Sequence, residues 1–257
     1  MKIAITGKGG VGKTFIAGTL ACRYAASGLT TIAIDADSSP NLGLTLGLSE
    51  AEVDRIVPVA ENSGLIEEKT QTGYQGVFHL TFTVDDIIRS QAVLTPCGVK
   101  ILVMGTVHVV GSGCACPAHH LIRTLINHLV TERNEIVILD MEAGIEHLGR
   151  GTAEQVDVML VVTDAHQASL VTAGRIVRMA LNAGIPHVAL VANRILGSGQ
   201  EEQIRVFAKG LGVPVAAVIP YDPLVMEAGV QGISPVGGDT TGTRAIAGLI
   251  TWLSGDA

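Results

Sequence analysis

Short runs of Val, Ile, Leu and Ala recur along the whole chain, and segments with helical periodicity separate them. The apolar runs are typical of strands buried on both faces and predict strands at residues 2–6, 31–35, 99–104, 136–140, 156–162, 187–192 and 213–219. The segments between them predict helices at residues 13–26, 117–132, 167–182, 201–209 and 244–253. Strands that alternate with helices of this length indicate βαβ units. The sequence therefore predicts an α/β fold with a doubly wound, mostly parallel sheet and helices on both faces.

The organisation of the chain indicates one domain. No internal repeat, linker or low-complexity tract interrupts the alternation, so residues 1–257 are interpreted as a single unit. Residues 50–91 are the least regular stretch, and the pattern does not define element boundaries there.

Composition and charge argue against two classes of partner. The formal net charge is −7, which gives no general attraction for nucleic acid or anionic lipid, and aromatic residues make up only 3% of the chain. No apolar run approaches the roughly 18 residues of a membrane-spanning helix. The first residues, MKIAITGKGG, lack the apolar core of a secretory leader. We therefore expect a cytoplasmic protein that binds neither nucleic acid nor membrane.

A phosphate-binding motif follows the first predicted strand directly. Residues 7–14 read GKGGVGKT, which satisfies G-x-x-x-x-G-K-[ST] between a strand and a helix and predicts a P-loop NTPase. Glycines let successive backbone N–H groups converge on phosphate oxygens, and the N-terminus of the next helix adds its dipole. Lys13 is placed to bridge the terminal phosphates, and the Thr14 hydroxyl to ligate Mg²⁺. The residues expected to bind nucleotide here are Gly9, Gly10, Val11, Gly12, Lys13, Thr14 and Phe15.

The sequence also favours one base over the other. P-loop proteins that bind guanine use an N-K-x-D motif, whose Asp accepts hydrogen bonds from the purine. Here Asn193-Arg194 follows an apolar strand, but Leu196 stands where that Asp would be. Because this acceptor is missing, ATP is favoured over GTP.

Four cysteines are too few for a disulfide framework in a chain of this length, and we expect them to be thiols. Cys22, in a predicted helix, is interpreted as a small buried apolar residue, whereas the role of Cys97 stays open. Cys114 and Cys116 form a C-x-C pair ahead of a predicted helix, whose dipole would favour the thiolate of Cys116. These thiolates suit zinc, nickel, copper(I) or an iron–sulfur cluster, although an inert turn remains the alternative.

The C-x-C pair supplies only half of the ligands that a closed metal site needs. Four ligands are typical of such a site, and the chain contains no second C-x-C or C-x-x-C. Two completions are open. Histidines near the pair could add ligands within one chain, or the same pair from a second copy could complete a Cys₄ site on a two-fold axis. The nearby histidines are His108, His119 and His120.

The segment KGGVGKT resembles the deviant Walker A motif of the MinD, ParA and nitrogenase iron protein class of P-loop ATPases. The second lysine of the motif, Lys8, carries the resemblance. In that class this lysine reaches across a dimer interface to the partner's nucleotide, as an arginine finger does. The resemblance therefore implies that Lys8 acts in trans and that the protein works as a homodimer.

Further positions match the same class. Asp35 and Asp37 resemble switch I, where the second acid positions the attacking water and the first supports the Mg²⁺ shell. Thr14, Asp35 and Asp37 would then hold Mg²⁺ directly or through water. Asp140 resembles the Walker B carboxylate, and Gly144 the switch II glycine that senses the γ-phosphate. The positions that resemble adenine-binding elements are Asn193, Arg194, Pro220, Tyr221 and Asp222.

The pair Cys114-Ala115-Cys116, together with the segment DMEAGIEH at residues 140–147, resembles the CooC family of nickel-insertion accessory ATPases of carbon monoxide dehydrogenase. This resemblance covers the whole chain. It implies an ATP-hydrolysing metallochaperone that delivers nickel to the dehydrogenase and binds Ni²⁺ or Zn²⁺ through Cys114 and Cys116 of both subunits. One departure from the class concerns switch I, because Ser38-Ser39 separates Asp37 from Pro40.

Two other readings stay open within the class. A nitrogenase-reductase-like iron–sulfur ATPase would carry a second cysteine shortly after Walker B, and residues 141–155 contain none. A positioning ATPase of the MinD or ParA type would show a basic C-terminal helix or a basic patch for DNA, whereas Arg244 is the only cation in residues 240–257.

Overall fold

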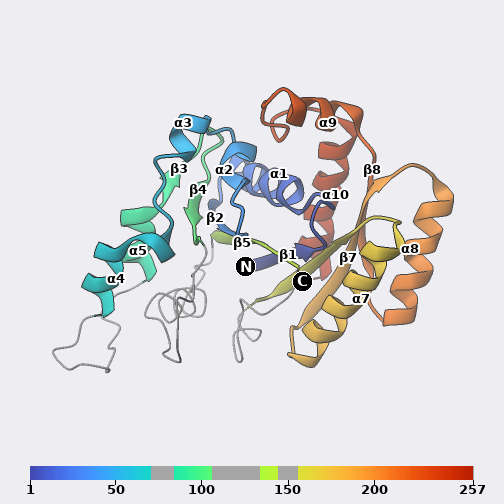
Figure 1. Cartoon of the computed structure of the whole chain (residues 1–257). Coiled ribbons are helices and arrows are strands. Elements are labelled where there is room, and N and C mark those ends of the chain that lie inside the picture. The colour runs from blue at the N-terminus through green and yellow to red at the C-terminus, as the bar shows by residue number, and fades with distance from the viewer. Residues whose placement is uncertain (71–83, 106–133, 144–155, 257) are drawn as a thin grey trace.

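A computed structural model describes residues 1–70, 84–105, 134–143 and 156–256 (Figure 1). Their centre is an eight-stranded sheet in the order β3-β4-β2-β5-β1-β6-β7-β8. Neighbouring strands are parallel, except that β3 pairs antiparallel with β4 at the edge. The strands are β1 (Lys2–Gly7), β2 (Thr30–Ala36), β3 (Val93–Leu94), β4 (Lys100–Val103), β5 (Glu135–Met141), β6 (Val158–Thr163), β7 (His187–Ile195) and β8 (Val215–Pro220).

Helices cover both faces of this sheet. In Figure 1, α1 and α10 lie on one face, and α7 and α8 lie on the other. The helical segments are α1 (Lys13–Ala26), α2 (Leu42–Thr45), α3 (Glu50–Val53), η1 (Val59–Glu61), α4 (Ser63–Thr70), α5 (Val84–Gln91), α7 (Gln167–Asn182), α8 (Ser198–Leu211), α9 (Pro223–Val230) and α10 (Thr241–Asp256). None of the helices in the described ranges is both long and apolar enough to cross a membrane.

Each central strand contributes to two hydrophobic cores. Ile3 and Ile5 of β1 point into the core beneath α1 and α10, whereas Ala4 between them belongs to the core beneath α7. Both faces of the sheet are therefore buried from solvent, which explains why the strand sequences are continuous apolar runs without polar alternation. The predicted α/β fold with a mostly parallel sheet is confirmed.

Several element boundaries agree with the sequence prediction. The helices expected at 13–26 and 167–182 coincide with α1 and α7, and the predicted strands overlap the observed ones. The helix expected at 117–132 lies outside the described residues. The short helices between 42 and 91 were not predicted. Single turns such as α3 carry no periodicity, whereas α5 is amphipathic but only eight residues long. Helix α9 was missed as well, since no residue in it is buried.

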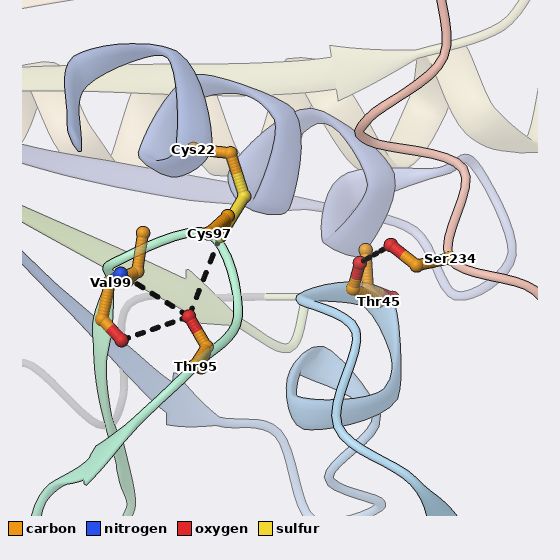
Figure 2. The surroundings of a disulfide bond; sticks show 6 residues. All are labelled: Cys22, Thr45, Thr95, Cys97, Val99 and Ser234. Atoms are coloured by element: carbon orange, nitrogen blue, oxygen red, sulfur yellow. Dashed lines mark hydrogen bonds between the residues drawn. A yellow bond between two sulfur atoms is a disulfide. The ribbon is translucent and has the colours of Figure 1, made fainter. Parts of the chain in front are cut away.

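The expectation that Cys22 is a thiol is wrong in this structure, because Cys22 forms a disulfide with Cys97 (Figure 2). Cys22 lies near the end of α1, and Cys97 lies in the turn between β3 and β4. Their Cα atoms are 5.5 Å apart, within the usual range for a disulfide, although 75 positions separate them in the chain. The pairing depends on the edge hairpin packing against α1, a tertiary contact that the spacing of cysteines does not reveal.

Candidate nucleotide site

The glycine-rich loop connects β1 to α1 at the carboxyl edge of the sheet. Lys8, Gly9 and Gly10 are exposed, whereas the Lys13 side chain is buried. Gly12 has φ +92°, and a Cβ atom there would lie 2.3 Å from Nδ2 of Asn193. The loop therefore needs glycine at this position both for its backbone conformation and for the close approach of β7.

Asn193 of β7 fixes the glycine-rich loop from the side. Its Nδ2 donates a hydrogen bond of 2.7 Å to the carbonyl of Val11, and the residue is only 4% exposed. The sequence predicted Asn193 as part of the base site. The structure adds a direct contact with the phosphate loop, so one side chain links the two parts of the site.

Two carboxylates lie opposite each other on neighbouring strands. Asp35 of β2 and Asp140 of β5 pair in register at the ends of their strands. Asp35 is fully buried and accepts hydrogen bonds from the backbone N–H groups of Leu42 (2.9 Å) and Asp37 (3.2 Å). Burial raises the pKa of Asp35 to about 6, although these N–H groups act to lower it. Asp37 itself is half-buried, nearer to solvent than the other two acids.

Asp140 is the least satisfied of these acids. Neither of its buried carboxylate oxygens has a hydrogen-bond partner of normal geometry among the residues that the structure describes. Burial raises its pKa to about 7, against the effect of the nearby Thr14 hydroxyl, while the charge of Asp35 raises it and that of Lys13 lowers it. Orphaned oxygen acceptors beside a hydroxyl and an ammonium fit a site for a hydrated Mg²⁺ ion and phosphate.

A pocket that opens to solvent lies next to the glycine-rich loop, at the ends of β7 and β8. Its wall contains every position predicted for adenine and also Phe15. Two lining residues come from α9, Val225 and Met226, and the sequence analysis missed them. The sequence Asp222-Pro223 could have indicated them, since an N-cap followed by proline marks a helix start. The lining residues are Gly12, Phe15, Asn193, Arg194, Ile219, Pro220, Tyr221, Asp222, Val225 and Met226.

The carboxylate of Asp222 is engaged within the protein. Oδ1 accepts the Leu224 N–H (3.1 Å), and Oδ2 accepts the Gly242 N–H (2.8 Å) and the Thr241 hydroxyl (3.0 Å). Burial acts to raise the pKa of Asp222, but these hydrogen bonds, with one from Thr240, hold it at about 2. The side chain therefore joins the N-termini of α9 and α10 and shapes the wall of the pocket.

The remaining predicted residues lie outside the described part of the chain. These are Gly144, Cys114 and Cys116, together with the three histidines near the C-x-C pair. Within the described ranges, no group of three or more His, Cys, Asp or Glu side chains could hold a metal ion alone. This result is compatible with Mg²⁺, which usually keeps water and binds substrate phosphates besides one or two carboxylates.

The sequence matches a known family over most of its length. Residues 2–236 match the CobQ/CobB/MinD/ParA nucleotide-binding domain. The carbon monoxide dehydrogenase accessory protein CooC of Rhodospirillum rubrum is 39% identical over 236 residues, which cover 91% of this chain and 89% of that protein. The chain is a CooC-type ATPase of the MinD/ParA class. The resemblance inferred from the sequence motifs and the expected ATPase class are thereby confirmed.

Other relatives of this CooC-type ATPase agree with the assignment. An uncharacterised ATP-binding protein of Methanocaldococcus jannaschii is 39% identical over 256 residues, covering 98% of this chain and 97% of that one. Among solved structures, MinD of Aquifex aeolicus superposes with a TM-score of 0.70 at 20% identity, covering 100% of this chain and 97% of that chain. MinD of Pyrococcus furiosus gives the same TM-score at 22% identity, covering 100% and 99%. These structures share the fold.

Proposed function

We propose that this CooC-type ATPase is a metallochaperone that hydrolyses ATP as a homodimer and supplies nickel for the maturation of carbon monoxide dehydrogenase. One observation carries the proposal: a phosphate loop, three acids and a pocket beside the loop meet at one sheet edge in a relative of a carbon monoxide dehydrogenase accessory protein. The metal ion is the cargo of the reaction, whereas Mg²⁺ is the cofactor of hydrolysis.

In the proposed complex, the nucleotide spans the glycine-rich loop and the pocket beside it. Backbone N–H groups of the loop and the Lys13 ammonium bind the phosphates, and the base enters the pocket at the ends of β7 and β8. Thr14, Asp35 and Asp37 would hold Mg²⁺ directly or through water, and Asp140 lies beside Asp35 on the neighbouring strand. When bound, this ion neutralises charge that develops on the transferred phosphoryl group.

Asp37 and Lys8 are the residues that we assign to the chemical step. The half-buried Asp37 orients the attacking water, since it is the acid nearest to solvent. Lys8 is exposed on the loop, where it is free to reach a nucleotide bound to a second copy. We assign γ-phosphate sensing to Gly144.

We assign the cargo to Cys114 and Cys116. Two thiolates from each subunit would make four ligands at the two-fold axis, the number typical of a closed site. Such a site forms and opens with the dimer, so nucleotide and metal binding become coupled, and the coupling is reciprocal. Metal binding requires Cys114 and Cys116 in the reduced, thiolate form.

Separate variants test the two halves of the proposal. In Lys8→Ala, ATP should no longer cause dimerisation in light scattering, while nucleotide affinity of the monomer should persist. In the double variant Cys114→Ser/Cys116→Ser, stoichiometric nickel or zinc should disappear while ATP hydrolysis remains. Dimerisation of the Lys8 variant with ATP, or unchanged metal binding by the cysteine variant, would contradict the corresponding assignment.

One observation favours a second candidate function. An iron–sulfur cluster carrier protein of Pyrococcus furiosus is 26% identical over 267 residues, covering 95% of this chain and 82% of that protein. The C-x-C pair of two subunits could hold a cluster in place of a single ion. A brown, oxygen-sensitive protein after anaerobic reconstitution with iron and sulfide would favour this candidate over the nickel chaperone.

A further inference from the structure

Glu142 connects three strands at the edge where the nucleotide site lies. It follows β5 directly, next to Met141, which pairs in register with Ala36 of β2. Its backbone carbonyl accepts a hydrogen bond of 2.6 Å from Oγ1 of Thr6. Thr6 is fully buried in β1 and precedes Gly7, the first residue of the glycine-rich loop. The backbone of Glu142 is thus fixed from the side of the phosphate loop.

The side chain of Glu142 extends toward the opposite neighbour, β2. Its Oε1 accepts hydrogen bonds from the backbone N–H of Ser38, at 3.2 Å, and from the Ser38 hydroxyl. Ser38 is the residue immediately after Asp37. A carboxylate acceptor makes these bonds stronger than neutral ones would be. One half-buried glutamate therefore links the residue before the phosphate loop to the residue after Asp37.

Short-range hydrogen bonds also shape the segment that carries Asp37. The Asp37 N–H donates to Oδ1 of Asp35 at 3.2 Å, and the Ser39 N–H donates to Oδ1 of Asp37 at 3.0 Å. These bonds curl the segment on itself, and its attachment to the residue after β5 runs through Ser38. The two bonds from Ser38 to Glu142 supply that attachment.

We propose that Glu142 is a positioning residue for ATP hydrolysis. It holds the segment of residues 37–39 against β5, so that the Asp37 carboxylate keeps the orientation that the attacking water requires. The inference rests on the role proposed above for Asp37. Ser38 and Glu142 are not among the residues that line the base pocket, so we expect Glu142 to affect kcat more strongly than nucleotide affinity.

The experiment compares kcat for ATP with the dissociation constant for Mg·ADP in purified full-length variants. Glu142→Ala should lower kcat about ten- to a hundredfold, the range expected for losing charge-assisted bonds that position a reacting group, with affinity within about twofold. Glu142→Gln keeps an acceptor oxygen and should recover most of the rate. Ser38→Ala changes an exposed residue and should lower kcat less, because the backbone N–H still donates. The control, Glu50→Ala, removes an exposed carboxylate on α3.

A double variant separates positioning from general stability. Ser38→Ala combined with Glu142→Ala should be no slower than Glu142→Ala alone, because both act through one contact. The inference is overturned if Glu142→Ala keeps the wild-type kcat, or if kcat and affinity fall together and Glu142→Gln restores neither. Asp37→Ala separates the role proposed for Asp37 from the role proposed for Glu142. Wild-type turnover in that variant overturns both roles. An inactive Asp37→Ala beside a fully active Glu142→Ala overturns the Glu142 inference alone.

Discussion

The substitution Asp140→Asn should stabilise the nucleotide-free protein at high pH while it abolishes hydrolysis. Asp140 is 1% exposed, and its carboxylate oxygens lack partners within the described residues. Burial holds its pKa at about 7, above the ordinary value of 3.8. In the folded protein the Asp140 carboxyl is therefore mainly neutral below pH 7, and its ionisation at higher pH lowers the stability of the fold relative to Asp140→Asn.

The sign and size of the effect follow from this pKa. Between about pH 4 and 7 the unfolded chain releases the proton of Asp140 while the folded protein retains it, so the free energy of unfolding falls as pH rises. At 1.36 kcal/mol for each pH unit, the penalty reaches an upper limit of about 4 kcal/mol at pH 8. Asparagine does not ionise, so the variant should gain up to this amount relative to wild type between pH 4 and 8.

Urea unfolding of both proteins without nucleotide, measured from pH 4 to 8, tests the reasoning. The control, Asp54→Asn, removes an exposed carboxylate at the end of α3 and should leave the pH profile unchanged. A constant difference between Asp140→Asn and wild type across this range would refute the claim that Asp140 is held in an unfavourable ionisation state. Retained ATP hydrolysis in the variant would remove Asp140 from the nucleotide site.

Three further outcomes follow from the structure. Gly12→Ala should weaken nucleotide binding at least tenfold in calorimetry and destabilise the fold by about 1–3 kcal/mol, because the new Cβ atom would displace Asn193 from the loop. An unchanged nucleotide affinity would contradict the close approach of Gly12 and Asn193. Asp222→Ala should cost about 2 kcal/mol through the capping bonds of α9 and α10. Because the pKa of Asp222 is lowered to about 2, its contribution to the free energy of unfolding is complete above pH 4 and is lost as the pH falls through 2. If urea denaturation at pH 1.5 still showed wild type to be more stable than Asp222→Ala, this reasoning would be contradicted. Reducing the Cys22–Cys97 disulfide should lower stability by about 4 kcal/mol, because the two residues are separated by 75 positions; equal urea midpoints with and without dithiothreitol would argue against the bond.

The phosphate loop was predictable because its information is contiguous in the chain. Eight consecutive residues after a strand specify the glycine-rich loop, and α1 begins at Lys13, where the motif places it. The helix also ends where expected, ahead of Gly28, which has φ +87°. Local propensity and motif spacing agree here, so the prediction did not depend on tertiary contacts.

Contacts between distant segments were not predictable in the same way. The hydrogen bond between Asn193 and Val11 forms because β7 lies two strands from β1 in the sheet. The sequence pattern does not predict this strand order. The same limit applies to Met226 in the pocket wall and to the bonds between Ser38 and Glu142. In each case, which residues become neighbours is decided by the order of strands or by an exposed helix without periodicity.

The proposed metal site between two subunits is tested most directly by titrating the metal-free protein with Ni²⁺, with and without a non-hydrolysable ATP analogue, followed by native mass determination. We expect a dimer that carries one nickel ion for every two chains when the analogue is present, and no such species for Cys114→Ser/Cys116→Ser. A single chain that holds both nickel and the analogue would contradict this expectation.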